Sequence, residues 1–167
     1  VGVQGKRIER ERKPAHLVFL VDVSGSMRSP QKLGMAKEAL KVLVDNLGPQ
    51  DSVALVTYAG ATRKVLGKTP ASKKAKIKAA LDELRPGGGT SMGSGVKLAY
   101  EEALKDLNPD HIHRVLVLSD GDANIGAESH NQILEMIRGY VDDGVTLSTI
   151  GLGMGNYKDS MMEQLAN

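Results

Sequence analysis

Oxygen-bearing side chains occur in three short stretches of the 167-residue sequence. Asp22-Val23-Ser24-Gly25-Ser26 places a carboxylate and two hydroxyls at alternate positions, and Gly25 permits a tight turn between the serines. Gly87-Gly88-Gly89-Thr90 adds a third hydroxyl, and Ser119-Asp120-Gly121 adds a second carboxylate. Oxygen-only ligands suit a hard divalent cation, Mg²⁺ or alternatively Mn²⁺ or Ca²⁺, rather than zinc or copper. Two formal charges among five side chains predict that one coordination position stays open.

Apolar runs precede two of these stretches and indicate strands that are buried on both faces. The runs cover residues 17–21, 53–56 and 115–118, and a more alternating run covers 145–150. Between them, apolar residues recur at helical spacing over 33–47, 77–84, 96–107 and 133–141. We expect the apolar faces of these four helices to lie in the core.

Buried strands that alternate with amphipathic helices specify the fold class. They predict a three-layer, doubly wound, Rossmann-like α/β domain with a mostly parallel sheet and helices on both faces. Residues 62–66 follow the second run too closely for a crossover helix, so we expect a short antiparallel edge strand there. Ligands of such sheets bind at the carboxyl ends of the strands. The loops that leave Val21, Ala59 and Leu118 are therefore the expected functional edge.

Composition and charge exclude several classes of protein. The net charge of +2 and the aromatic content of 3% argue against a nucleic-acid partner. The absence of Cys excludes disulfides, Cys-ligated zinc and thiol catalysis. Residues 1–14, in which acidic and basic side chains are interleaved, predict an extended lead-in or linker. No apolar run approaches the roughly 18 residues of a membrane span, so we predict no direct membrane insertion of this segment.

The order of these motifs resembles the metal-ion-dependent adhesion site of von Willebrand factor type A domains. That site has the pattern Asp-x-Ser-x-Ser, then Thr, then Asp. The matching residues here are Asp22, Ser24, Ser26, Thr90 and Asp120. The resemblance covers residues 16–167. Segments 18–27, 153–157 and 162–166 look most like bacterial cell-envelope members, among them those resembling the A domain of calcium-activated chloride channel proteins.

The resemblance implies a protein-binding module for adhesion or scaffolding. In such a module the bound divalent cation captures an acidic residue of a protein partner. Five residues are expected on the rim around the open position: Met27, Arg28, Ser91, Gly121 and Asp122. The resemblance also implies an extracytoplasmic setting in bacteria, in the periplasm or at the cell surface.

The resemblance further implies that the chain is a fragment of a larger protein. The domain is expected to span residues 15–167 and to lack the last strand and the last helix of the family.

Two other functions are compatible with part of this pattern. A metal-dependent phosphohydrolase could use Asp22 as nucleophile, but Ser24 stands where such chemistry generally wants a second carboxylate. No general base accompanies the pentapeptide, so we expect no enzymatic turnover. A structural domain of an envelope assembly with a merely stabilising ion is the other alternative. The four histidines, at the borders of predicted elements, are interpreted as surface or capping residues.

Overall fold

The computed structural model describes residues 12–59, 61–88, 92–121 and 130–152. Five strands form one sheet in the order β3-β2-β1-β4-β5. They are β1 (Ala15–Asp22), β2 (Ser52–Ala59), β3 (Ala61–Pro70), β4 (Ile112–Ser119) and β5 (Val145–Gly151). β1 pairs in parallel with β2 and β4, and β4 pairs in parallel with β5. β3 is antiparallel to β2, as predicted for the edge strand.

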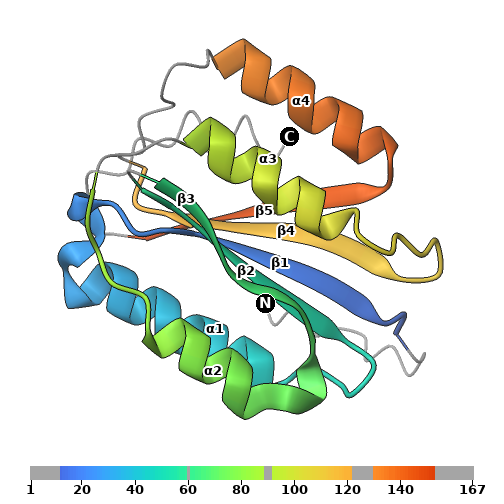
Figure 1. Cartoon of the computed structure of the whole chain (residues 1–167), viewed down its shortest axis with the longest axis horizontal. Coiled ribbons are helices and arrows are strands. Elements are labelled where there is room, and N and C mark those ends of the chain that lie inside the picture. The colour runs from blue at the N-terminus through green and yellow to red at the C-terminus, as the bar shows by residue number, and fades with distance from the viewer. Residues whose placement is uncertain (1–11, 60, 89–91, 122–129, 153–167) are drawn as a thin grey trace, which may run out of the picture.

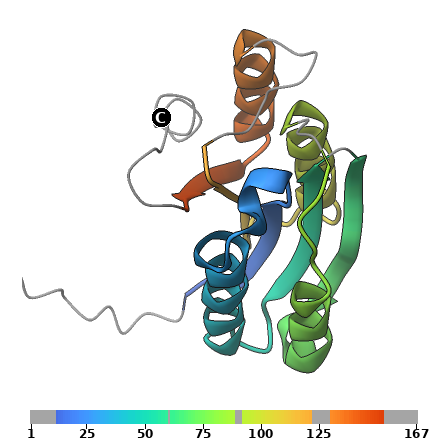
Figure 2. The same cartoon turned by 90° about the vertical axis from the view of Figure 1, so that its left-hand side faces the viewer.

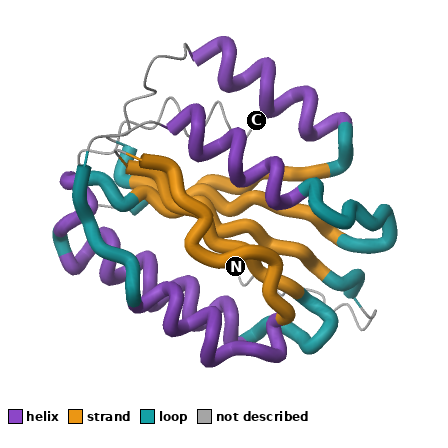
Figure 3. Tube along the Cα trace, viewed as in Figure 1, coloured by secondary structure: helices purple, strands orange, loops and turns teal. Residues whose placement is uncertain are grey.

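Helices cover both faces of this sheet. They are α1 (Met35–Asp45), α2 (Lys74–Asp82), α3 (Met92–Ala103) and α4 (His130–Asp142), with short turns η1 (Gly25–Arg28), η2 (Pro30–Gly34) and η3 (Ala71–Lys73). α1 and α2 lie on one face, and α3 and α4 lie on the other (Figures 1 and 2). Coloured by secondary structure, the strands form a single layer between two layers of helix (Figure 3). The predicted fold class is confirmed.

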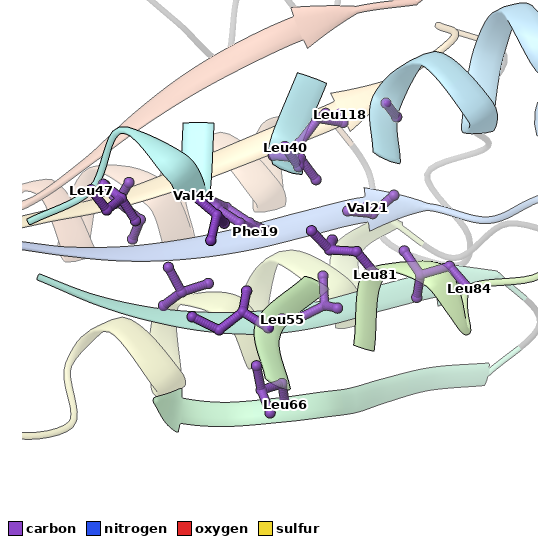
Figure 4. Packing of buried hydrophobic residues seen from close by; sticks show 14 of the residues in the cluster. Phe19, Val21, Leu40, Val44, Leu47, Leu55, Leu66, Leu81, Leu84 and Leu118 are labelled. Carbon is purple, nitrogen blue, oxygen red and sulfur yellow. The ribbon is translucent and has the colours of Figure 1, made fainter. Parts of the chain in front are cut away.

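The central strand β1 shows why the apolar runs are uninterrupted. All eight of its residues are buried. Successive side chains of a strand point to opposite faces. Phe19 and Val21 therefore pack with α1 and α2, where Figure 4 shows them beside Leu40, Val44 and Leu81. Val18 and Leu20 pack with α3 and α4. The middle of a strand with a core on each side is therefore apolar at successive positions, as residues 17–21 are.

Helix α3 approaches the sheet closely at one glycine. A Cβ atom at Gly95 would stand 2.7 Å from the Cβ atom of Tyr58 on β2, closer than two carbon atoms can pack. The absence of a side chain at Gly95 thus lets α3 lie against the carboxyl end of β2. This contact brings the start of α3 to the edge of the sheet where the candidate site lies.

Several details differ from the sequence predictions. The edge strand β3 is ten residues long rather than five, because its pairing with β2 continues to Pro70. Leu107 and Val141, predicted to face the core, are exposed. Leu107 lies past the end of α3, where the chain turns at Asp106, whose φ is 55°. His16 and His113, predicted to be surface or capping residues, are buried.

Candidate metal site

The two predicted carboxylates lie side by side at the carboxyl end of the sheet. Asp22 is the last residue of β1, and Asp120 directly follows the neighbouring strand β4. Between them, the hydroxyl of Ser119 donates a hydrogen bond to Asp22 Oδ2 at 3.0 Å. The Gly121 N–H donates to Ser119 Oγ at 3.2 Å, and Gly121 has a φ of 80°, which favours glycine. The parallel register of β1 and β4 thus places both acids at one edge.

The serine loop folds back on the first carboxylate. The Ser24 N–H donates a hydrogen bond to Asp22 Oδ1 at 2.8 Å. The hydroxyl oxygens of Ser24 and Ser26 are 2.9 Å apart, with Ser24 buried and Ser26 exposed. The loop therefore presents two hydroxyls together, that of Ser24 buried and that of Ser26 at the surface.

Backbone hydrogen bonds hold the glycine-rich loop against the serine loop. The Gly87 N–H donates to Val23 O at 2.7 Å, and the Gly25 N–H donates to Gly88 O at 3.4 Å. Thr90, the predicted third hydroxyl, lies outside the described residues. The described residues Gly87 and Gly88 contact the loop that carries Ser24.

Asp22 is a buried acid whose charge has no cationic partner among the described side chains. Asp22 has 0% of its surface exposed. Burial raises the pKa of the Asp22 carboxyl, hydrogen bonds from Ser24 and Ser119 oppose that shift, and the nearby Asp120 charge adds to it. In the described part of the chain, no cationic side chain lies within ion-pair distance of Asp22. A buried carboxylate in this situation is stabilised by a bound cation.

Asp120 differs from Asp22 because a lysine reaches it. Lys32 Nζ lies 2.7 Å from Asp120 Oδ2, and the Asp120 side chain is fully buried. Lys32 was not among the site residues predicted from the sequence. One signal could have pointed to it: Lys32 directly precedes the apolar stripe of residues 33–47 and lies a few residues after the serine loop. That turn lies over the end of β1, so a long side chain there can reach the neighbouring strand end.

A buried tyrosine flanks the acids on the other side. Tyr58 of β2 is the register partner of Asp22 and is fully buried. Burial, with the negative charge of Asp22, raises the pKa of the Tyr58 hydroxyl well above its ordinary value. That hydroxyl has no hydrogen bond of good geometry within the described ranges. Tyr58 lies two residues past the predicted apolar run of residues 53–56 and was not among the predicted site residues.

The predicted rim is only partly placed at the surface. Arg28 is exposed and Gly121 is half-buried, while Ser91 and Asp122 lie outside the described residues. Met27 is fully buried and packs in the core between the sheet and α1, so it is not a rim residue. The tight turn of η1 points its one apolar side chain inward.

The donor set fits a hard divalent cation. Carboxylate and hydroxyl oxygens converge, and the charge of Asp22 lacks a cationic partner among the described side chains. Within the described ranges, no three His, Cys, Asp or Glu side chains gather as a metal cluster. An ion at this edge would therefore need hydroxyl ligands in addition to two carboxylates. The motif supplies both kinds of oxygen ligand.

Comparisons with known proteins agree with this fold. Residues 16–167 match the model of the von Willebrand factor type A domain. The Escherichia coli protein YfbK is 42% identical over the whole of this chain, which spans 29% of YfbK. The inter-alpha-trypsin inhibitor heavy chain H2 of Mesocricetus auratus is 28% identical over 84% of this chain, which spans 16% of that protein. The chain thus spans less than a third of either relative.

A solved structure gives the same result in three dimensions. Proximal thread matrix protein 1 from the mussel byssus, with a zinc-occupied adhesion-site motif, superposes with a TM-score of 0.77 at 25% identity. The match covers 93% of this chain and 42% of the mussel protein. Because the family model covers nearly the whole chain, the chain belongs to the von Willebrand factor type A domain family.

Proposed function

We propose that this domain is a metal-dependent protein-binding module that captures an acidic residue of a partner. Asp22, Ser24, Ser26, Thr90 and Asp120 hold a divalent cation in this proposal, with Mg²⁺ as the expected ion and Mn²⁺ or Ca²⁺ as alternatives. The observation that carries it is the buried Asp22 carboxylate, which meets Ser24 and the Ser119–Asp120 strand end without a cationic partner among the described residues.

Charge explains why this donor set suits capture of an acid. When bound, the ion supplies Lewis acidity at an open coordination position that accepts a carboxylate. The two carboxylates nearly neutralise a divalent charge, and the neutral hydroxyls of Ser24 and Ser26 add ligands without adding further negative charge. The hydrogen bonds of Asp22 to Ser24 N–H and Ser119 Oγ hold the acid in place.

We propose an adhesion or scaffolding role within a larger, extracytoplasmic bacterial protein. The short span of this chain relative to its matched relatives supports the larger parent. The resemblance to bacterial cell-envelope members supports the location. None of the described helices is both long and apolar enough to cross a bilayer. Residues 122–129 and 153–167 lie outside the described residues, so the predicted missing last strand and helix stay a prediction.

The phosphohydrolase alternative gains no support from the geometry. Ser24, where a phosphohydrolase of the aspartyl type needs an acid, bonds to Asp22 and Ser26 instead. We therefore expect no turnover of phosphate esters or nucleoside triphosphates above background. Activity that disappears in an Asp22→Asn variant would contradict this expectation.

The decisive test is binding of an acidic peptide surrogate with and without a chelator. Calorimetry should detect binding in millimolar Mg²⁺ or Mn²⁺ and none in EDTA. Asp22→Ala and Asp120→Ala should abolish it, whereas Lys76→Ala, an exposed change on α2, should leave it intact. Saturating metal at about a hundred times its Kd should add roughly 2.7 kcal/mol of stability to the parent domain. Equal peptide affinity in metal and in EDTA would leave the ion a structural role only.

A further inference from the structure

We propose that Lys32 is a built-in competitor for the metal: its ammonium holds the Asp120 carboxylate in the metal-free domain and must leave when a divalent cation binds. This inference rests on the proposed function, because it concerns the same site. In this proposal Lys32 sets the affinity of the site for the metal. Lys32 is not one of the five motif residues.

The position of Lys32 is fixed by the turn that carries it. Ser29 caps η2, its side chain accepting a hydrogen bond from Gln31 N–H, and the Lys32 N–H donates to Ser29 O at 2.9 Å. The next residue, Leu33, is buried in the core. The backbone of η2 is therefore anchored at the sheet end where β1 stops (Figure 1). From this anchor only the Lys32 side chain has to move.

The ion pair itself is tight and largely shielded from water. Nζ lies 2.7 Å from Asp120 Oδ2, the Asp120 side chain has no exposed surface, and that of Lys32 is 26% exposed. Electrostatic attraction strengthens as water is excluded, so this contact holds more firmly than an exposed pair. The partial exposure of the lysine also gives its ammonium a direct exit to solvent.

An ammonium and a divalent cation cannot both occupy this position at low cost. Both would lie within a few ångströms of the same buried carboxylate, where like charges repel strongly. Binding of the metal therefore exchanges one cation for another at Asp120, and the lost Lys32 contact weakens the apparent affinity. The released ammonium stays on the η2 turn next to the site, where it can pair with the acidic partner.

A second buried acid offers a matched control. Glu102 on α3 has a side chain that is 3% exposed, and Lys64 Nζ approaches its Oε1 at 3.2 Å, with Lys105 also paired to it. This cluster lies beside His16, at the opposite end of the sheet from Asp22. Lys64→Met removes one of two lysines from a buried carboxylate away from the metal site, and so controls for the loss of one lysine charge beside a buried acid.

The test is calorimetric titration of the metal-stripped domain with Mg²⁺ and, separately, Mn²⁺ at fixed ionic strength. Lys32→Met should bind either ion about tenfold more tightly than the parent, and Lys64→Met should match the parent. Lys32→Gln, which keeps a donor without the charge, should behave like Lys32→Met. In metal-free buffer Lys32→Met should unfold at lower urea than the parent, and saturating metal should remove that difference.

The outcomes separate this inference from the proposed function. Metal binding by the parent with equal or weaker binding by both Lys32 variants would overturn the competitor role and leave the metal site intact. Such a result would mean that Lys32 steadies Asp120 while the ion is bound. Absence of binding in the parent and in all variants would overturn the metal site itself, and the competitor role with it.

Discussion

At the amino end of the sheet, the buried Asp51 carboxylate accepts hydrogen bonds from the backbone N–H groups of Ala15 and Gly48 at 2.8 and 2.7 Å and pairs with Arg12. At the carboxyl end, the equally buried Asp22 accepts bonds from Ser24 and Ser119 but forms no ion pair within the described part of the chain. The Arg12 hydrogen bond lowers the pKa of Asp51 to about 2, whereas burial raises the pKa of Asp22.

The buried histidines of the amino end are satisfied in the same way as Asp51. His16 Nε2 lies 3.3 Å from the carbonyl of Glu102 and its Nδ1 lies 2.8 Å from Ser52 Oγ. His113 Nδ1 donates to Ala103 O at 2.9 Å, and its Nε2 accepts from Asn108 N–H at 3.2 Å. The described polar groups at the amino end of the sheet thus have partners, whereas at the carboxyl end the charge of Asp22 has no cationic partner among the described side chains.

The largest expected effect comes from removing the Asp51 carboxylate at the amino end of the sheet. Asp51→Ala should lower the free energy of unfolding by about 3 kcal/mol, because two backbone N–H groups near the start of β1 and β2 lose their acceptor. Urea denaturation measures this loss. Arg12→Ala should cost less than about 1 kcal/mol, since the Arg12 side chain is half exposed. Equal losses in the two variants would mean that the ion pair, not the backbone capping, is what matters.

Acidification should destabilise the same end in a defined window. Burial lowers the pKa of His16 to about 4 from an ordinary value of 6.5, so the unfolded chain binds the proton first. The stability that His16 contributes is therefore complete above pH 6.5 and is lost as pH falls toward 4. We expect a loss of roughly 2 kcal/mol in this range.

Urea midpoints at pH 7, 5.5 and 4.5 measure this effect. The His16→Gln variant keeps a polar side chain without a titrating ring. Its free energy of unfolding should therefore fall less steeply with falling pH than that of the parent. The contribution of Asp51 falls in a lower window, between its unfolded value of 3.8 and about 2. An unchanged pH dependence of the free energy of unfolding in His16→Gln would assign the acid sensitivity to another group.

Periodicity made most of the fold predictable. A strand with a core on both sides has an uninterrupted apolar run in its sequence, such as residues 17–21. A helix with one buried face has apolar residues at helical spacing. The start of α3 was missed because Gly93 and Gly95 are poor helix formers. Contact with Tyr58 on β2, which lies far away in the sequence, requires a small residue there and outweighs that propensity.

The candidate site was predictable where the motif is local and where an acid directly follows a buried parallel strand, as Asp22 and Asp120 do. Asp22, Ser24 and Ser26 lie within five residues, so their convergence follows from one tight turn. Lys32 reaches Asp120 across 88 residues of sequence through a flexible side chain, and no pattern in the chain identifies Asp120 as its partner. Burial of His16 likewise depends on the carbonyl of Glu102, 86 residues away. Contacts of this kind appear only when the elements are packed together.

The smallest expected effect is also the one that separates the two ends most directly. In metal-free buffer, Asp22→Asn should raise the free energy of unfolding by about 1 kcal/mol, because it removes a buried charge that has no cationic partner among the described residues. Asp51→Asn should instead lower it, because the charge removed there is paired with Arg12. Saturating Mg²⁺ should reverse the sign at Asp22 by stabilising the parent alone, and leave the Asp51 result unchanged. If Asp22→Asn destabilises the metal-free domain as Asp51→Asn does, the Asp22 charge is already compensated, and the contrast between the two ends fails.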